Sequence, residues 1–384
     1  MPDKQRTRSV GRRRLVLALV AALAAGSFAF GASLGDGAPP RPSVASTLSA
    51  SRLAGQRIVL GFPGTHPPAA VRRMVRAGEL AGVILFADNL PGRAAGRRLI
   101  RRLQAIRRPP GLRDPLLAMT DQEGGLVKRL GGAPTVSART MGARGAAFSR
   151  SQGRRTAANL RNAGVNVDLA PVLDVARPGG AIAAADRGFG STAAQVAATA
   201  VPFAAALQAG GVAATGKHFP GLGDARISTD DAVQRIGLSK RALRQVDEAP
   251  YRSFVAAGGD MVMLSTAIYP ALANRPAAFA PAIATGELRQ RLGFQGVSIT
   301  DALDTVSVHA FGGAAKVARA AASAGADLLL YTDPAEAAKA HRALLKGLRS
   351  GTLPRSSFED SVSRVLALRH RLGTAPPPPH SQRP

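Results

Sequence analysis

Short apolar runs alternate along the chain with longer stretches in which apolar residues recur at helical spacing. Each run has the length of a buried β-strand, and each longer stretch has room for a helix and its loops. Eight runs follow one another, at residues 58–62, 83–86, 115–119, 165–169, 212–215, 261–264, 297–300 and 327–331. Eight βα units in succession are typical of a (β/α)8 barrel of the TIM type. The pattern therefore predicts an α/β protein with one globular domain over residues 51–372.

Two of the longer stretches show the helical pattern most clearly. Residues 193–207 are followed by Gly210 and Gly211, which indicate the end of a helix. Residues 357–372 place Val365 and Leu372 on the same side, so we expect them to form the helix that closes the barrel.

Polar side chains follow several of the apolar runs directly. In a barrel, the carboxyl ends of the strands meet at one face, so these side chains are expected to lie together. Carboxylates, cations and hydroxyls suit a sugar, whose hydroxyl groups exchange hydrogen bonds with all three. They do not suit a phosphate, because Asp224 directly follows the loop glycines and would repel it. The polar residues are Asp88, Asn89, Asp121, Gln122, Glu123, Asp174, Lys217, His218, Ser265, Thr266, Asp301 and Asp333.

The two ends of the chain have the composition of segments outside the fold. Residues 1–14 are rich in Lys and Arg, and an apolar run follows at 15–34, so residues 1–34 predict a signal peptide or an uncleaved membrane anchor. Positive charge before the run directs the rest of the chain outward, and we expect an extracellular or cell-envelope protein. Residues 35–50 are rich in Pro, Gly and Ser and predict a linker, and residues 373–384 predict a disordered tail.

The formal net charge of the chain is +27. Such a charge permits attraction to nucleic acid, anionic lipid or acidic polymers. The arginine clusters at 72–73, 97–98 and 101–102 fall in helix-like stretches, however, and solvated helix faces account for them. Aromatic residues make up only 4% of the chain, with no Trp, which argues against binding of single-stranded nucleic acid. There is no Cys, and the six His lack metal-ligand spacing, so we expect no metal and no cofactor. We also expect a monomer.

Six segments, in order along the chain, resemble motifs of glycoside hydrolase family 3, in its single-domain β-N-acetylglucosaminidase branch. The most specific is GKHFPGLG at 216–223, which is similar to the family signature K-H-F-P-G-[HL]-G. The other five are GVILFADN at 82–89, DQEGG at 121–125, GVNVDLAPVLDV at 164–175, DRGFG at 186–190 and GVSITDALD at 296–304. One such motif can arise by chance, whereas six in order over residues 56–373 make the resemblance specific.

The resemblance implies a barrel that hydrolyses β-linked N-acetylhexosaminides with retention of configuration, for example in peptidoglycan fragments. Retaining hydrolysis needs a carboxylate nucleophile and an acid/base group, and by motif Asp301 is the nucleophile. Asp121, Arg187, Lys217 and His218 occupy positions that bind the sugar in the family. Taken without the resemblance, each of these residues could equally be a helix cap, a surface charge or an ion-pair partner.

The glycine loop departs from the family pattern at one position. In this branch the loop continues to D-[ST]-H, whose His is the acid/base, and the matching residues here are Ser228, Thr229 and Asp230. The His is absent. Asp230 is the first candidate to replace it, with Asp231 and Asp224 as alternatives. A carboxylic acid can act as general acid when burial or a nearby negative charge raises its pKa.

Three interpretations of this departure remain open. Asp230 takes the place of the His, or the enzyme is slow and cleaves only substrates with good leaving groups, or the barrel binds sugar without turnover. General acid assistance is worth about 10²–10⁴-fold, so its loss weakens catalysis without abolishing it. A β-glycosidase for a non-acetylated sugar is a further alternative. The competing structural interpretation of Asp230 and Asp231 is a solvated turn.

Overall fold

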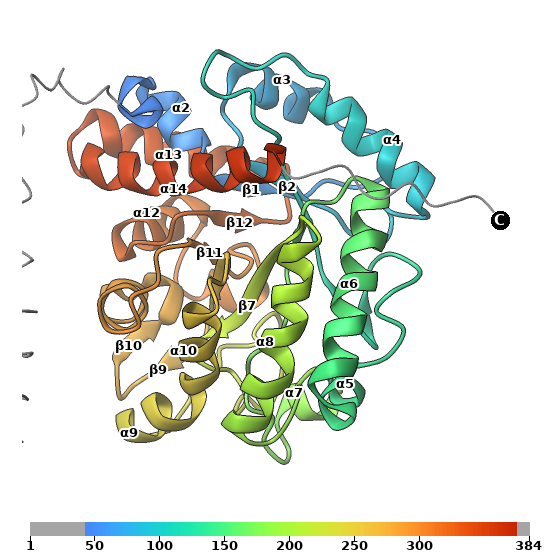
Figure 1. Cartoon of the computed structure of the whole chain (residues 1–384). Helices are drawn as coiled ribbons and strands as arrows, with labels where there is room; N and C mark the ends of the chain where they lie inside the picture. Colours follow the sequence, from blue (N-terminus) through green and yellow to red (C-terminus); the bar gives the residue numbers. More distant parts are fainter. Residues whose placement is uncertain (1–42, 375–384) are drawn as a thin grey trace, which may run out of the picture. The chain divides into compact units, whose positions relative to one another are not determined.

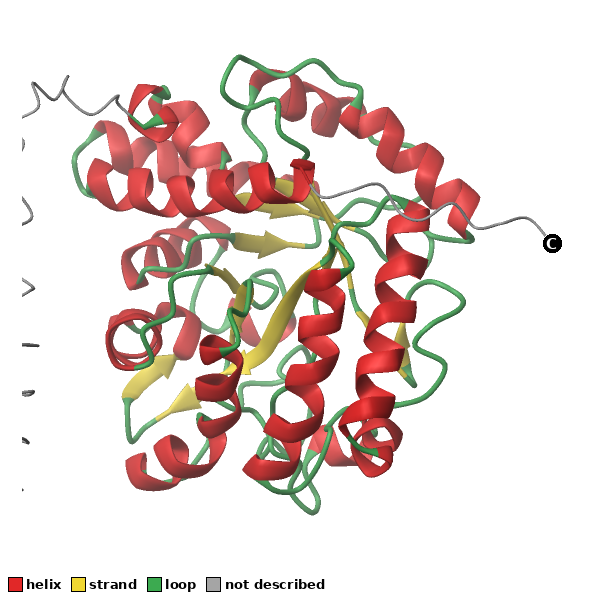
Figure 2. Ribbon diagram, in the orientation of Figure 1, coloured by secondary structure: helices red, strands yellow, loops and turns green. Residues whose placement is uncertain are grey.

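The computed structural model describes residues 43–374, and in this part of the chain parallel strands form a barrel inside a layer of helices (Figures 1 and 2). The strands are hydrogen-bonded in the order β11-β8-β7-β6-β3-β2-β1-β12, so each lies beside the next barrel strand along the chain. Each overlaps one of the eight apolar runs, and the predicted (β/α)8 barrel is confirmed. The strands are β1 (Ile58–Leu60), β2 (Gly82–Ile84), β3 (Leu117–Thr120), β6 (Val167–Asp168), β7 (Ala213–Phe219), β8 (Met261–Leu264), β11 (Val297–Thr300) and β12 (Leu329–Tyr331).

Backbone hydrogen bonds join every neighbouring pair of these strands. β1 and β12 pair in parallel, with Val59 opposite Leu330. Between β11 and β12 an isolated parallel bridge joins Ile299 and Leu328, and the amide of Thr300 donates to the carbonyl of Leu328 at 3.0 Å. This last contact completes the barrel.

Alternate side chains of the strands belong to two separate apolar layers. In β1, Val59 packs inside the barrel, whereas Ile58 and Leu60 pack against the surrounding helices. The side chains of Val365 and Leu368, from α14 (Arg355–Thr374), join the inner layer. The predicted closing helix is therefore confirmed, and the filled interior leaves the carboxyl ends of the strands as the place for a cavity.

Helices and short hairpins connect the strands. α8 (Ala193–Ala209) is the helix predicted before the Gly-Gly pair. Two hairpins, β4 (Gln122–Gly124) with β5 (Val127–Lys128) and β9 (Ile268–Tyr269) with β10 (Ala273–Pro276), follow β3 and β8. The other helices of the described part are α2 (Ala50–Gly55), α3 (Ala69–Ala77), α4 (Arg93–Gln104), α5 (Ala138–Arg144), α6 (Ala146–Ala163), α7 (Ala181–Ala184), α9 (Lys240–Ala242), α10 (Ala249–Ala256), α11 (Val306–His309), α12 (Ala314–Ala324), α13 (Pro334–Arg349), η1 (Val44–Thr47), η2 (Leu243–Asp247), η3 (Ala277–Phe279) and η4 (Ala282–Arg291).

The linker predicted for residues 35–50 is wrong over its last part. From Ser43 onward the chain forms η1 and α2, and Ala45 and Leu48 are buried. Ser43 and Ser49 are the N-caps of these two helices, and the side chain of each accepts a hydrogen bond from an amide three residues later. Serines that are common in linkers serve here as helix caps.

The predicted signal or anchor segment 1–34 lies outside the described residues. The same holds for residues 375–384 of the predicted tail, whereas Gly373 and Thr374 belong to α14.

A buried carboxylate just before β12 joins three segments of the barrel. Asp327 Oδ1 accepts a hydrogen bond from Arg364 at 2.8 Å, and Oδ2 accepts from the amide of Ser298 at 2.8 Å and from Arg289. Burial by itself would raise the pKa of Asp327, but the charges of Arg289 and Arg364 outweigh burial and hold the pKa below its ordinary value.

We predict that Asp327→Ala lowers the free energy of unfolding by about 3–5 kcal/mol, because it leaves largely buried guanidinium groups without their acceptor. Urea unfolding of the full chain measures this. Asp360→Ala, which removes an exposed carboxylate from α14, is the control and should change stability by no more than about 0.5 kcal/mol. Equal losses in the two variants would contradict the structural role of Asp327.

Candidate active site

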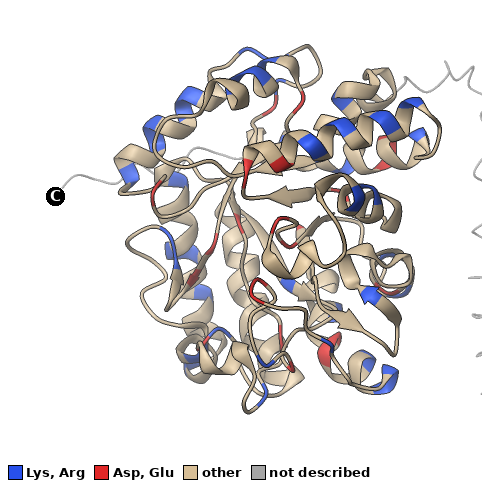
Figure 3. Ribbon diagram, turned by 180° about the vertical axis from the view of Figure 1, so that it is seen from behind, with Lys and Arg blue, Asp and Glu red and all other residues tan. Residues whose placement is uncertain are grey.

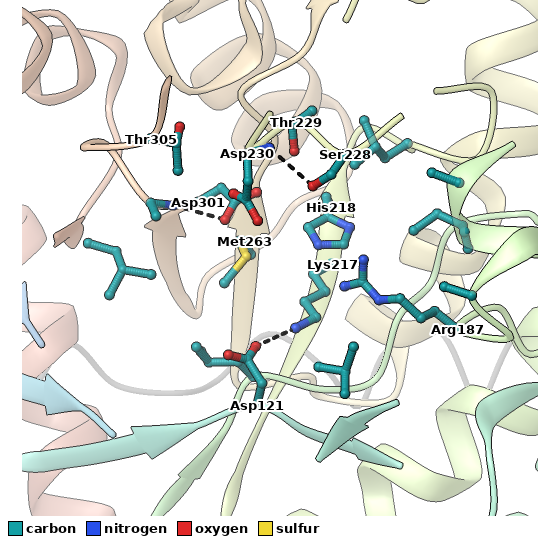
Figure 4. Close-up of a pocket in the computed structure, with 18 of the residues that line it drawn as sticks. Asp121, Arg187, Lys217, His218, Ser228, Thr229, Asp230, Met263, Asp301 and Thr305 are labelled. Atoms are coloured by element: carbon teal, nitrogen blue, oxygen red, sulfur yellow. Dashed lines mark hydrogen bonds and ion pairs between the residues drawn. The ribbon is translucent and has the colours of Figure 1, made fainter. Parts of the chain in front are cut away.

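A cavity of about 340 Å³ lies at the carboxyl ends of the strands, and all six residues predicted for the site line it (Figure 4). Four of them end or follow barrel strands, and two come from the long loops after β6 and β7. The strand-end residues are Asp121, Lys217, His218 and Asp301, and the loop residues are Arg187 and Asp230.

A cluster of buried charges forms one side of the cavity. Lys217 Nζ lies 2.7 Å from Asp121 Oδ1 and 2.7 Å from Glu123 Oε1. Arg187 donates two hydrogen bonds to Glu123, from Nε to Oε2 and from Nη2 to Oε1, both at 2.8 Å. The side chains of Lys217 and Glu123 are each only 2% exposed. One carboxylate is thus shared by two cations, Lys217 from strand β7 and Arg187 from the loop after α7.

The cluster fixes the charge state of its members. Burial by itself would raise the pKa of Glu123 and lower the pKa of Lys217. The charges of Lys217 and Arg187 outweigh burial and hold the pKa of Glu123 well below its usual range, and Asp121 and Glu123 raise the pKa of Lys217. Both Glu123 and Lys217 are therefore ionised at neutral pH.

His218 is held by Asp174. Its Nδ1 lies 2.8 Å from Asp174 Oδ2, and Asp174 Oδ1 accepts hydrogen bonds from the amides of His218 at 3.1 Å and Leu222 at 2.6 Å. Because Asp174 engages Nδ1, the other ring nitrogen, Nε2, is left to face the cavity. The pairing of β7 with β8 is irregular between Gly216 and Phe219, and two consecutive side chains there line the same cavity.

The loop after β7 follows a path that only glycine allows at Gly223. A Cβ atom added there would lie 1.9 Å from the carbonyl oxygen of Val175. Nearby, the hydroxyl of Tyr269 donates to the carbonyl of Gly221 at 3.0 Å. The loop that carries Asp230 is therefore anchored close to the end of β7.

Two carboxylates, Asp301 and Asp230, face the cavity from different segments (Figure 4). Asp230 belongs to an exposed turn, yet its side chain points into the cavity. Burial raises the pKa of Asp230, and the charge of Asp301 raises it further, while His218 and Arg187 only partly oppose this. The raised pKa of Asp230 favours retention of its proton beside the carboxylate of Asp301.

A hydrogen bond joins the loop of Asp230 to the segment that follows Asp301. Ser307, in α11, donates its hydroxyl to the carbonyl of Thr229, and both residues are buried. Because Thr229 directly precedes Asp230, this contact ties the backbone beside Asp230 to the segment after Asp301.

The alternatives to Asp230 are not placed in the cavity. Neither Asp224 nor Asp231 is among the residues that line it, and Asp231 is exposed. The structure therefore brings Asp230, of the three candidates, together with Asp301.

Three charged residues of the site received no role from the sequence. The signal for Glu123 was its place in the D-Q-E-G-G motif. Arg129 lines the cavity, and its Nε has no hydrogen-bond partner among the described residues. Asp168 is a buried residue of β6, and its Oδ1 accepts a hydrogen bond from the amide of Gln122 at 3.0 Å. Burial raises the pKa of Asp168 to about 8. No sequence signal marks Asp168, because it lies inside an apolar run.

Two absences hold for residues 43–374 alone. No helix in this range combines the length and the apolar character that crossing a bilayer requires. In the same range, no three His, Asp or Glu side chains are grouped so that they could hold a metal ion.

The chain was compared with known proteins. The family described as Glycosyl hydrolase family 3 N terminal domain matches residues 54–368. The chain is 36% identical over 341 residues to a protein of Arthroderma benhamiae named Uncharacterized secreted glycosyl hydrolase, across 86% of this chain and 96% of that protein. It is 32% identical over 288 residues to Beta-hexosaminidase of Stenotrophomonas maltophilia strain R551-3, across 72% of this chain and 83% of that enzyme.

A solved structure has the same fold. A glycoside hydrolase family 3 β-N-acetylglucosaminidase from Paenibacillus sp. FPU-7 superimposes with a TM-score of 0.80 at 32% identity, and the match covers 85% of this chain and 63% of that enzyme. The family match spans nearly the whole barrel, and carboxylates and cations stand at the strand ends of that barrel. This protein belongs to glycoside hydrolase family 3.

Proposed function

We propose that this protein hydrolyses terminal β-N-acetylglucosaminides with retention of configuration, with Asp301 as the nucleophile and Asp230 as the acid/base. The observation that supports this most is the pair of carboxylates in one cavity, in which burial and the charge of Asp301 raise the pKa of Asp230. Relatives named beta-hexosaminidase and β-N-acetylglucosaminidase support the choice of sugar.

In the first step Asp230 is protonated and Asp301 is ionised. The carboxylate of Asp301 attacks the anomeric carbon, and Asp230 gives its proton to the glycosidic oxygen. The bond between the anomeric carbon and that oxygen breaks, and the aglycone leaves as an alcohol.

In the second step Asp301 is esterified and carries no charge. One of the influences that raise the pKa of Asp230 is then absent, so Asp230, now ionised, can accept a proton. It takes that proton from water, the water oxygen attacks the anomeric carbon, and Asp301 leaves as a carboxylate. Two inversions at the same carbon give net retention.

The charged side of the cavity is proposed to hold the sugar. Asp121 and Lys217 offer an acceptor and a donor to ring hydroxyls, and His218 offers the ring nitrogen that Asp174 leaves free. Arg187 and Arg129 add cationic donors at the lining. Charged hydrogen-bonding groups of this kind contribute more than neutral ones to binding of a hydroxylated ligand.

Peptidoglycan fragments in the cell envelope are the proposed source of the substrate. Support comes from the basic and apolar sequence of residues 1–34, which favours export, and from the relative named as a secreted glycosyl hydrolase.

We predict that Asp301→Ala abolishes turnover of both an activated aryl β-N-acetylglucosaminide and a natural β-linked disaccharide. Asp230→Ala should lower kcat/KM for the disaccharide by about 10²–10⁴-fold and for the aryl substrate by much less, since only the disaccharide needs protonation of its leaving group. Steady-state kinetics of the full chain measures both. Asp231→Ala, an exposed carboxylate beside the cavity residue, is the matched control and should behave as wild type.

Three outcomes would contradict this proposal. Wild-type kinetics in Asp230→Ala would refute Asp230 as the acid/base. Saturable sugar binding without turnover in wild type, unchanged in Asp301→Asn, would support the non-catalytic interpretation. Turnover of β-glucosides in preference to β-N-acetylglucosaminides would support the alternative sugar.

We predict that activity on the disaccharide falls as the pH rises through the pKa of Asp230, because the general acid then loses its proton. Since that pKa is raised, the fall should begin at a higher pH than the ordinary aspartic acid range near 4. In Asp230→Asn the alkaline decline of kcat/KM should disappear. An alkaline decline that persists unchanged in Asp230→Asn would assign it to another group.

We predict that Ser307→Ala lowers kcat for the disaccharide by roughly tenfold and leaves KM nearly unchanged, because it frees the loop of the acid without touching the sugar-binding residues. The aryl substrate should be nearly unaffected, which separates mispositioning of the acid from general loss of structure. Equal losses on both substrates would indicate a purely structural role for Ser307.

A further inference from the structure

Helices α3 and α4 present arginines to solvent and contain no acidic residue. Figure 3 shows them as helices with basic positions along their outer sides. Their apolar residues, among them Val75 and Leu99, are buried against the barrel. We call the exposed arginines of these helices the basic face; they are Arg72, Arg73, Arg76, Arg93, Arg97, Arg98, Arg101 and Arg102.

The basic face lacks compensation by neighbouring charges. Arginines four residues apart on one helix repel each other, and such pairs occur at 72/76, 93/97, 97/101 and 98/102. Among the described residues, no Asp or Glu forms an ion pair with any arginine of the face. Binding of an external anion would reduce the repulsion between these arginines.

The next helix of the outer layer extends the same surface. α6 packs beside α4, where Gly96 of α4 lies close to Ala163 of α6. α6 contains no acidic residue, and its Arg150, Arg154 and Arg155 are exposed. The positive surface is therefore broad rather than confined to a pocket, which suits an extended partner.

The chain enters the described fold beside the basic face. Val44, in η1, lies against Gly111 in the loop that follows α4. In the sequence, the apolar run 15–34 precedes this point, and residues 35–42 separate the two. A fully extended chain of that length reaches at most about 30 Å. An anchor in the apolar run would therefore be joined to the described fold by a short segment.

We propose that the basic face docks on the phosphate groups of an anionic lipid bilayer. Guanidinium groups form paired hydrogen bonds with phosphate, and each cation near an anionic surface adds to the attraction. The short connection to an apolar segment favours a membrane over a soluble polyanion. Docking is independent of the reaction, because no residue of the face lines the catalytic cavity.

The test compares the full chain with Arg98→Gln/Arg101→Gln/Arg102→Gln. Partition is measured by cosedimentation with vesicles of phosphatidylglycerol and phosphatidylcholine in equal amounts, and with vesicles of phosphatidylcholine alone. The ratio of the two partition coefficients cancels the contribution of the apolar run. We expect wild type to prefer the anionic vesicles and the triple variant to lose about 100-fold of that preference, at roughly fivefold per arginine.

The matched control removes three exposed cations from α13, with Arg342→Gln/Lys346→Gln/Arg349→Gln. It should keep most of the preference. Equal losses in the two triple variants would overturn the proposal, because net charge alone would explain them. Absence of any preference in wild type would overturn it too. A third outcome would also overturn the proposal: wild type binds soluble polyphosphate through the same arginines but shows no preference for anionic vesicles. Aryl substrate turnover, which should be unchanged, shows that each variant is folded.

Discussion

The shared carboxylate of Glu123 is the contact on which the arrangement of the cavity depends. It comes from the hairpin after β3 and binds Lys217 at the end of β7 and Arg187 from the loop after α7. Without it, two largely buried cations would face each other with no common acceptor, at a cost of about 3–5 kcal/mol. Lys217 in turn fixes Asp121. Three of the groups proposed to hold the sugar, Asp121, Arg187 and Lys217, are therefore set by one buried ion-pair network.

The two carboxylates proposed for the reaction are held in different ways. The backbone of Asp301 is part of the barrel, since its amide donates to the carbonyl of Leu264 on β8 at 2.9 Å. Asp230 is held by a loop whose contacts include the hydrogen bond from Ser307 to Thr229. A strand end offers a fixed position for a nucleophile. A loop tolerates substitution more readily, so the residue that serves as the acid can differ there.

The fold could be predicted because buried parallel strands are nearly continuous apolar runs, and eight of them are visible in the sequence. The linker prediction is wrong over its last part because Ser is common in flexible segments and is also a preferred helix N-cap. Ser43 and Ser49 serve as N-caps here. Lys217 could be found from its place at the end of an apolar run, whereas Asp230 was found through the family pattern.

The remaining parts of the site depend on contacts between distant segments. Asp168 lies inside an apolar run, and its position near the charged cluster follows from its pairing with Gln122, far away in the sequence. Arg129 has no regular spacing to any other site residue, and its place in the cavity is set by the hairpin after β3. Neither kind of placement leaves a local signal in the sequence.

A carboxylate at the acid/base position also bears on which molecule receives the sugar from the glycosyl-enzyme. With Asp230 ionised as the base, an inorganic phosphate that approached the anomeric carbon would meet a like charge. At about 4 Å and an effective dielectric of about 20, each pair of unit charges repels by about 4 kcal/mol. Water meets no such barrier. A neutral imidazole would not repel phosphate in this way, so a carboxylate in the role proposed for Asp230 favours water as the acceptor.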